Sequence, residues 1–179
     1  MNDEDDQNSS PMQDRLEDQY KRLQKRLDSY GEDDIVMHEE FGESVADVQD
    51  MERYMLTIDD SKELLSFYIS TAAHIESESA LIILAHSFDF GINQRGSLDF
   101  LRENLTQSDR EDMLYCLGII DPGLKGELAR VRKRRNELAH SRDHQRIDDI
   151  DTEKNNVKRA YEALDKLKDI GIEVEMKKV

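Results

Sequence analysis

Apolar residues recur at spacings of three and four along most of the chain, which places side chains on one face of an α-helix. The first such segment, residues 12–31, carries a heptad-like stripe: Leu16, Tyr20, Leu23, Leu27 and Tyr30. We predict an amphipathic N-terminal helix here that ends at Gly31. It either packs on its own domain or pairs with a second copy of itself. The preceding residues 1–11 are acidic and polar without apolar periodicity, so we expect an acidic disordered tail.

Residues 32–43 resemble a linker with a short extended piece at 35–37, and residues 44–170 carry the remaining helical patterns. Gly91 and Gly96 bracket a loop, and Ser108 with Glu111 has the spacing of a capping box. The final residues, 171–179, alternate like a short strand. The helices are expected at 44–56, 60–88, 97–105, 108–118, 121–141 and 152–169. The pattern therefore predicts an all-α fold, an antiparallel helical bundle with an extra N-terminal helix.

Composition agrees with helices and narrows the setting. Charged residues make up 37% of the chain, tryptophan is absent, and the net charge is −16. Such acidity argues against general nucleic-acid binding and suits a salt-rich host. The single cysteine, Cys116, excludes an internal disulfide and lies in an apolar stretch where we expect it buried. With no signal-peptide pattern and no apolar run long enough for a membrane, we expect a cytoplasmic protein.

The most informative residue is an arginine on an apolar helix face. On a wheel of the helix that begins at Asp121-Pro122, Arg135 stands at the centre of a stripe of Leu124, Leu128, Val131, Leu138 and Ala139. A guanidinium stays charged when buried, so it requires an anionic or polar partner. That partner is either an internal carboxylate or a phosphate in a cleft or interface. Glu76 has a similar central place on the wheel of residues 60–88, so a Glu76–Arg135 pair is one hypothesis.

His140 follows Asn136 by four residues, so the two side chains lie one helical turn apart. The asparagine amide can fix the tautomer of an imidazole. Arg135 and His140 are about 140° apart on an unbroken helix, so one copy presents them poorly to a single phosphate. Either the helix ends near Ala139, or two copies of the motif meet across an interface.

Cations cluster around this motif. Residues 130–146 contain only two acidic side chains, Glu137 and Asp143. The basic side chains in the same segment are Arg130, Arg132, Lys133, Arg134, Arg135, Arg142 and Arg146. We interpret Arg132, Lys133, Arg134, Arg142 and Arg146 as a site for the phosphates of a polyanion. The alternative is a solvated helix face with internal pairs such as Lys133–Glu137.

Arg135-Asn136-Glu137-Leu138-Ala139-His140 resembles the Arg-polar-x-x-x-His signature of the HEPN domain family. The stretch from 116 to 141 is also similar to the end of HEPN proteins related to the mannitol operon regulator. The resemblance covers about residues 44–170, with specificity concentrated in the motif helix.

The resemblance implies a homodimeric, metal-independent endoribonuclease without a cofactor, of the kind that serves as the toxin of a defence or toxin–antitoxin pair. By that analogy His140 acts as general base or acid, Arg135 binds the scissile phosphate, and Asn136 orients the histidine. The analogy also makes RNA the polyanion, so that Arg132, Lys133, Arg134, Arg142 and Arg146 are RNA-binding. In the pair expected from the two wheels, Glu76 supports Arg135. The products carry 2′,3′-cyclic phosphate ends. Arg142 stands where some members carry a modifiable tyrosine, so that type of regulation is not expected.

Three other interpretations compete with this one. His140, His144 and Asp148 have the spacing of metal ligands, although Arg142 and Arg146 would repel a cation. A catalytically inactive HEPN-like dimer would serve as a regulatory or interaction module. A DNA-binding regulator lacks a clear helix-turn-helix pattern and a basic surface.

Overall fold

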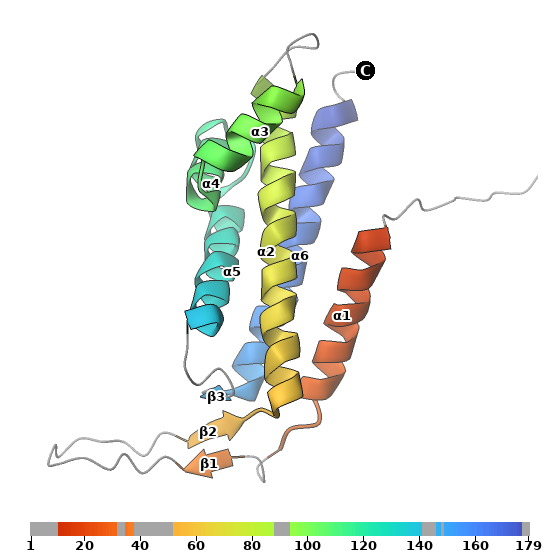
Figure 1. Ribbon diagram of the computed structural model, residues 1–179, viewed down its shortest axis with the longest axis vertical. Coiled ribbons are helices and arrows are strands. Elements are labelled where there is room, and N and C mark those ends of the chain that lie inside the picture. Colours follow the sequence, from red (N-terminus) through yellow and green to blue (C-terminus); the bar gives the residue numbers. More distant parts are fainter. Residues whose placement is uncertain are drawn as a thin grey trace, which may run out of the picture.

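The computed structural model describes residues 11–31, 35–37, 52–87, 94–140, 146–147 and 149–176. Within these residues the chain forms six helices and three short strands (Figure 1). The predicted all-α fold class is confirmed in substance, because the strands form only a small accessory sheet at one end of the helices.

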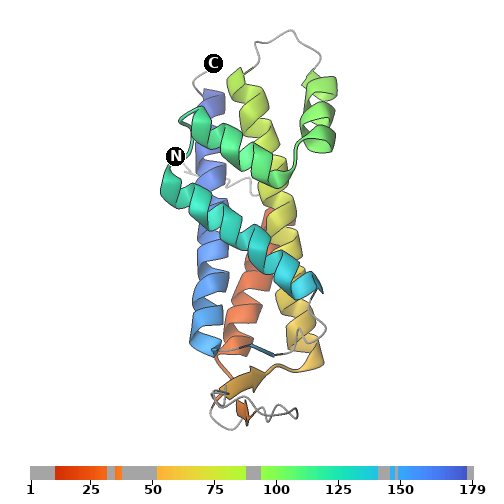
Figure 2. The same cartoon turned by 90° about the vertical axis from the view of Figure 1, so that its left-hand side faces the viewer.

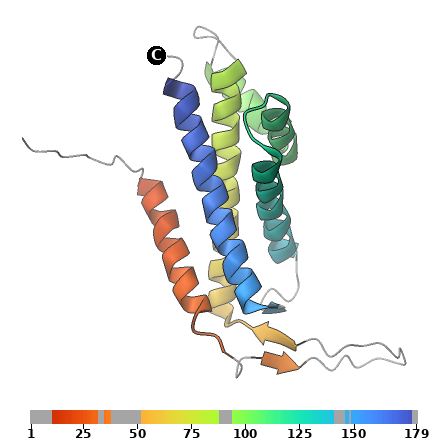
Figure 3. The same ribbon diagram turned by 180° about the vertical axis from the view of Figure 1, so that it is seen from behind.

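Two long helices form the centre of the molecule. α2 (Ile58–Ser87) and α6 (Ile150–Met176) contact each other and run in the same direction (Figures 1 and 3). α1 (Pro11–Leu27) packs along one side of this pair and runs the opposite way. α5 (Pro122–His140) crosses the other side obliquely, as Figure 2 shows. The bundle therefore has a parallel central pair, where the sequence pattern predicts antiparallel neighbours throughout.

The two ends of α2 are covered differently. α3 (Gln94–Asn104) and α4 (Gln107–Cys116) pack on its C-terminal part, and α4 also contacts α5 (Figure 1). At the other end, β1 (Ile35–Met37), β2 (Glu52–Met55) and β3 (Arg146–Ile147) form an antiparallel sheet in the order β1-β2-β3.

The sheet confirms one prediction and overturns another. The extended piece expected at 35–37 is β1. The helix expected over 44–56 is wrong at residues 52–55, which form β2, while residues 44–51 lie outside the described part. The segment pairs on both sides, with β1 and with β3, and these long-range partners are not visible in the local pattern.

The stripe on α1 packs against the same chain. Leu16, Leu23 and Leu27 are buried in the core, and Tyr20 stacks on Tyr161 with ring centroids 4.5 Å apart. The alternative in which α1 packs on its own domain therefore applies, since its apolar face is already covered.

The buried face of α2 differs from the predicted one. The wheel of residues 60–88 predicts an inner face of Leu65, Ile69, Ala72, Ala80 and Ile83. The last three are buried, but Ile69 is 48% exposed, whereas Leu64, Phe67 and Tyr68, which lie off that face, are fully buried. α2 touches α1, α5 and α6 as well as α3 and α4, so it is buried over a wide arc. A narrow stripe chosen from a few residues does not locate the centre of such an arc.

Two helix boundaries differ from their predicted places. Thr106 and Asp109 form the capping box of α4, in place of the predicted Ser108 and Glu111. The carboxylate of Glu111 is instead buried inside the domain. Gly96 lies within α3, not in a loop, and Gly91 is outside the described residues.

Cys116, expected to be buried, is exposed at the last position of α4.

The predicted strand-like tail is also wrong as far as Met176, because α6 continues through it. A Cβ on Gly171 would lie 3.5 Å from a side-chain carbon of Ile82 on α2. This is an ordinary van der Waals distance, so Gly171 packs against α2 as a larger residue also could, and it does not end α6. Residues 177–179 lie outside the described part.

Candidate functional site

The motif lies on α5, which begins as the sequence predicts. The backbone N–H of Leu124 donates to Oδ1 of Asp121 at 2.7 Å, and Pro122 occupies the first helical position. Leu124, Leu128, Val131 and Leu138 are buried. These residues fasten α5 to the bundle and leave its remaining faces to polar side chains.

Arg135 makes the contact that the two wheels predicted. Its Nη1 lies 4.0 Å from Oε1 of Glu76, and the two side chains are 32% and 40% exposed. Neither residue is at the centre of a buried face, because the long arginine stem carries its guanidinium to the edge of the core. Ala139, assigned to the same stripe, is exposed.

Asn136 and His140 are both exposed, and α5 continues through His140. Oδ1 of the Asn136 side chain accepts a hydrogen bond from Nε of Arg135 at 3.2 Å. Within the described residues no hydrogen bond joins Asn136 to His140. α5 ends at His140, one residue beyond the end near Ala139 that the first of the two solutions to the angular separation requires, and His140 is still helical. Arg135 and His140 therefore keep their separation of about 140°, and a meeting of two copies remains the other solution.

The basic cluster is more fully neutralised than its sequence indicates. Along α5, every lysine and arginine contacts a carboxylate, and several partners come from other helices. The closest N–O distances are 2.7 Å for Lys125–Asp112, 2.6 Å for Arg130–Glu127, 3.3 Å for Arg132–Glu111, 3.7 Å for Lys133–Glu137, 2.5 Å for Arg134–Glu153 and 4.0 Å for Arg135–Glu76. The cluster is thus not a region of unopposed charge. Arg142 and the side chain of Arg146 lie outside the described part.

The most buried ion pair of α5 was not predicted from the sequence. Glu153 on α6 is 4% exposed and accepts from Nη2 and Nε of Arg134, whose side chain is 25% exposed. The buried hydroxyl of Tyr68 also donates to Glu153, at 3.2 Å. Burial lowers the pKa of Arg134, but the charge and hydrogen bonds of Glu153 outweigh it and the net pKa is raised. Burial, together with the Glu153 charge, raises the pKa of Tyr68.

The sequence does contain a pattern that indicates the burial of Glu153. It falls on the apolar stripe of α6, three residues after Ile150 and four before Val157, and all three are buried. A charged residue at the centre of an apolar stripe is the pattern that singles out Arg135, and it singles out this carboxylate as well.

A second buried carboxylate lies between α4 and α5. Glu111 accepts from Gln107 at 2.8 Å and from Arg132 at 3.3 Å. Burial raises the pKa of Glu111, and the two hydrogen bonds oppose that effect only in part. Arg132, predicted to contact RNA, therefore already serves an internal carboxylate.

A metal centre has no support in the described part of the chain. His140 and the other described histidine, cysteine, aspartate and glutamate residues form no group of three able to hold a metal ion. His144 and Asp148, the other two predicted ligands, lie outside the described residues.

Among the helices described, none combines the length and hydrophobicity needed to span a membrane.

No protein-family model matches this chain, and neither curated proteins nor solved structures include a match. A functional assignment therefore depends on the geometry of α5 and on the resemblance of its motif.

Proposed function

We propose that the protein is a metal-independent endoribonuclease of HEPN type that acts as a homodimer. The observation that carries the proposal is the contact of Arg135 with Glu76. At 4.0 Å it is the longest ion pair of α5 among the described residues, and both side chains are partly exposed. Arg135 is thus only loosely paired and retains donors for a phosphate, unlike Arg134, whose carboxylate partner is buried and close.

The residues of the motif have complementary roles in this proposal. His140 takes the proton of the ribose 2′-hydroxyl, whose oxygen attacks the adjacent phosphorus. The bond from phosphorus to the 5′ oxygen breaks, and the leaving oxygen takes up a proton from water. Arg135 binds the phosphate and stabilises its developing charge. Asn136 holds the guanidinium of Arg135 through their hydrogen bond, a different role from the histidine-orienting one expected from the sequence. The products are a 2′,3′-cyclic phosphate and a 5′-hydroxyl.

The symmetry of a dimer supplies what one chain lacks. Arg135 and His140 project in different directions from one continuous helix. In a twofold dimer with α5 at the interface, Arg135 of one copy meets His140 of the other, and the same contact occurs twice. An antitoxin protein that covers this interface would control such an enzyme, in keeping with a toxin or defence role.

One observation favours a second candidate, an inactive HEPN-like helical dimer that acts as a regulatory or interaction module. All lysine and arginine side chains of α5 contact carboxylates, in a protein of net charge −16. Such a surface offers few free cations to a polyanion. The two candidates differ in whether RNA is cut.

The test is cleavage of labelled total RNA and of tRNA in EDTA, at several salt concentrations, with the fragment ends mapped. Wild-type protein should leave cyclic phosphate ends, and His140→Ala should lower the rate by about 10²–10⁴-fold. His86→Ala is the matched control, because His86 is also exposed near the end of a helix but lies on α2. It should cleave at the wild-type rate.

Mixing two inactive variants tests the shared site. If each site takes Arg135 from one copy and His140 from the other, random pairing of Arg135→Gln with His140→Ala protein restores roughly a quarter of the sites. Recovery to this level supports the dimer site. A folded wild-type dimer that cuts no RNA at any salt concentration would instead establish the inactive module.

A further inference from the structure

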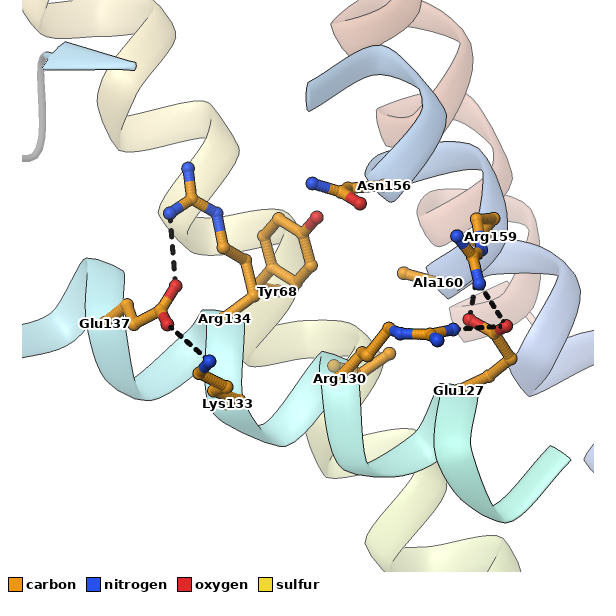
Figure 4. Close-up of a pocket in the computed structure, with 10 residues that line it drawn as sticks. Tyr68, Glu127, Arg130, Lys133, Arg134, Glu137, Asn156, Arg159 and Ala160 are labelled. Atoms are coloured by element: carbon orange, nitrogen blue, oxygen red, sulfur yellow. Dashed lines mark hydrogen bonds and ion pairs between the residues drawn. The ribbon is translucent and has the colours of Figure 1, made fainter. Parts of the chain in front are cut away.

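A cavity of about 270 Å³ lies between α5 and α6, away from the proposed ribonuclease motif. Figure 4 shows its lining, in which side chains from both helices face one another across the gap and Tyr68 of α2 stands behind them. Arg135, Asn136 and His140 are not part of this lining. The polar side chains that give the cavity its chemical character are Glu127, Arg130, Lys133, Arg134, Asn156 and Arg159.

Two arginines are held side by side by one carboxylate. Arg159 uses Nε and Nη2 to contact the two oxygens of Glu127, and Arg130 contacts the same group through Nη1 at 2.6 Å (Figure 4). Burial raises the pKa of Glu127, but hydrogen bonds from Arg159 and Arg130 outweigh it, so the net pKa is lowered and the carboxylate stays charged. Glu127 therefore fixes the position of both guanidinium groups.

This arrangement leaves donors on the cavity side. A guanidinium carries five N–H donors, and Glu127 has only two oxygens to accept them. Within the described residues, no hydrogen bond is made by Nε or Nη2 of Arg130, or by Nη1 of Arg159. Two adjacent, pre-positioned arginines are well suited to a phosphate, which accepts paired N–H groups at several oxygens.

The rest of the lining is consistent with a charged ligand. Lys133 adds an exposed ammonium, and its contact with Glu137 is loose, at 3.7 Å. The Asn156 amide makes no side-chain hydrogen bond in the described part of the chain, so it can both donate and accept. Four cations and the carboxylates of Glu127 and Glu137 line the cavity, and a third carboxylate, Glu153, pairs with Arg134 beside it, which leaves a net surplus of one positive charge.

We propose that this cavity binds a small phosphate monoester, no larger than a nucleoside monophosphate. Arg130 and Arg159 hold the phosphate, and Asn156 contacts the polar group next to it. The size limit comes from the volume, which is just below the range of about 300–1,000 Å³ typical of pockets for drug-sized ligands.

Isothermal titration calorimetry at low ionic strength tests the proposal with AMP, inorganic phosphate and adenosine. AMP and inorganic phosphate should bind, and adenosine, which lacks the phosphate, should bind at least about tenfold more weakly than AMP. Arg130→Gln and Arg159→Gln should each weaken AMP binding by about tenfold or more. Arg102→Gln is the matched control, since this exposed arginine on α3 donates to Ser77 outside the cavity, and it should leave binding unchanged.

Folding is monitored by circular dichroism for every variant. Should Arg159→Gln not fold, because Arg159 ties α6 to α5, the exposed Arg130 carries the test by itself. No binding of AMP or phosphate at millimolar concentration would overturn the proposal, as would an equal effect of Arg102→Gln. Binding of a single-stranded RNA oligomer that depends on Arg130, without binding of AMP, would also overturn it and assign the cavity to an RNA strand.

Discussion

Replacement of Glu153 by glutamine should destabilise the fold more than any other loss of one charge on α6. The carboxylate accepts one hydrogen bond from Tyr68 and two from Arg134, at 3.2, 2.5 and 3.3 Å, and is 4% exposed. Glutamine keeps the shape and one acceptor oxygen, but it turns an amide towards a guanidinium and leaves that cation without a counter-charge.

The size of the loss can be worked out from these contacts. Breaking a fully buried ion pair costs about 3–5 kcal/mol. Arg134 is 25% exposed, so water compensates part of its loss, and we expect about 2–4 kcal/mol. For a protein of this size, that corresponds to a fall in Tm of roughly 5–15 °C.

Urea unfolding followed by far-UV circular dichroism measures the change. The matched control is Asp151→Asn on the same helix, because Asp151 is 84% exposed and its contact with Lys154 is 3.4 Å long. It should cost less than about 1 kcal/mol. Removing both partners, as Arg134→Leu with Glu153→Leu, should recover much of the loss, since neither charge is then buried alone. A loss for Glu153→Gln no greater than that for Asp151→Asn would mean that the buried pair does not stabilise the fold.

Two further predictions concern helix contacts. Burial would raise the pKa of Asp60, but hydrogen bonds from Tyr30, Thr57 and Arg26 outweigh it, so the pKa is lowered from 3.8. Because the pKa of Asp60 is lower in the folded protein, its carboxylate stabilises the fold at pH values above the pKa of the unfolded chain. Asp60→Asn should therefore be less stable than wild type near pH 7, and the difference in unfolding free energy should shrink as the pH falls below 3.8. A difference independent of pH would contradict this. Thr106→Ala should cost about 1 kcal/mol by removing the capping box of α4, whereas Ser108→Ala should cost less than half as much in the same urea titration. Equal effects would show that this cap does not stabilise α4.

Helix existence was predictable from the sequence where local signals decide it, namely a regular apolar stripe or an N-terminal cap. The stripe on α1 and the cap of α5 are examples, since Leu23, Leu27 and Asp121 lie where the pattern placed them. The prediction failed where distant partners decide the structure. Residues 52–55 follow their sheet neighbours, and α6 continues past Gly171, where it packs along α2.

The candidate site shows the same division. The wheels correctly brought Glu76 and Arg135 together, because each projects from a long regular helix. They could not show that the carboxylates of Glu111 and Glu153 neutralise Arg132 and Arg134, because these pairs depend on how α4 and α6 pack against α5. The basic cluster therefore looked more exposed and less balanced than it is.

The contrast between Arg134 and Arg135 separates structure from function on α5. The Arg134 pair is short and its carboxylate is buried, whereas the Arg135 pair is 4.0 Å long and partly exposed on both sides. A pair of the second kind contributes only about 0–1 kcal/mol to folding. The Arg135→Gln variant used for RNA cleavage should thus unfold at nearly the wild-type urea concentration. Loss of cleavage with unchanged stability would assign Arg135 to the phosphate, while a loss of stability comparable to that of Glu153→Gln would make it a structural residue.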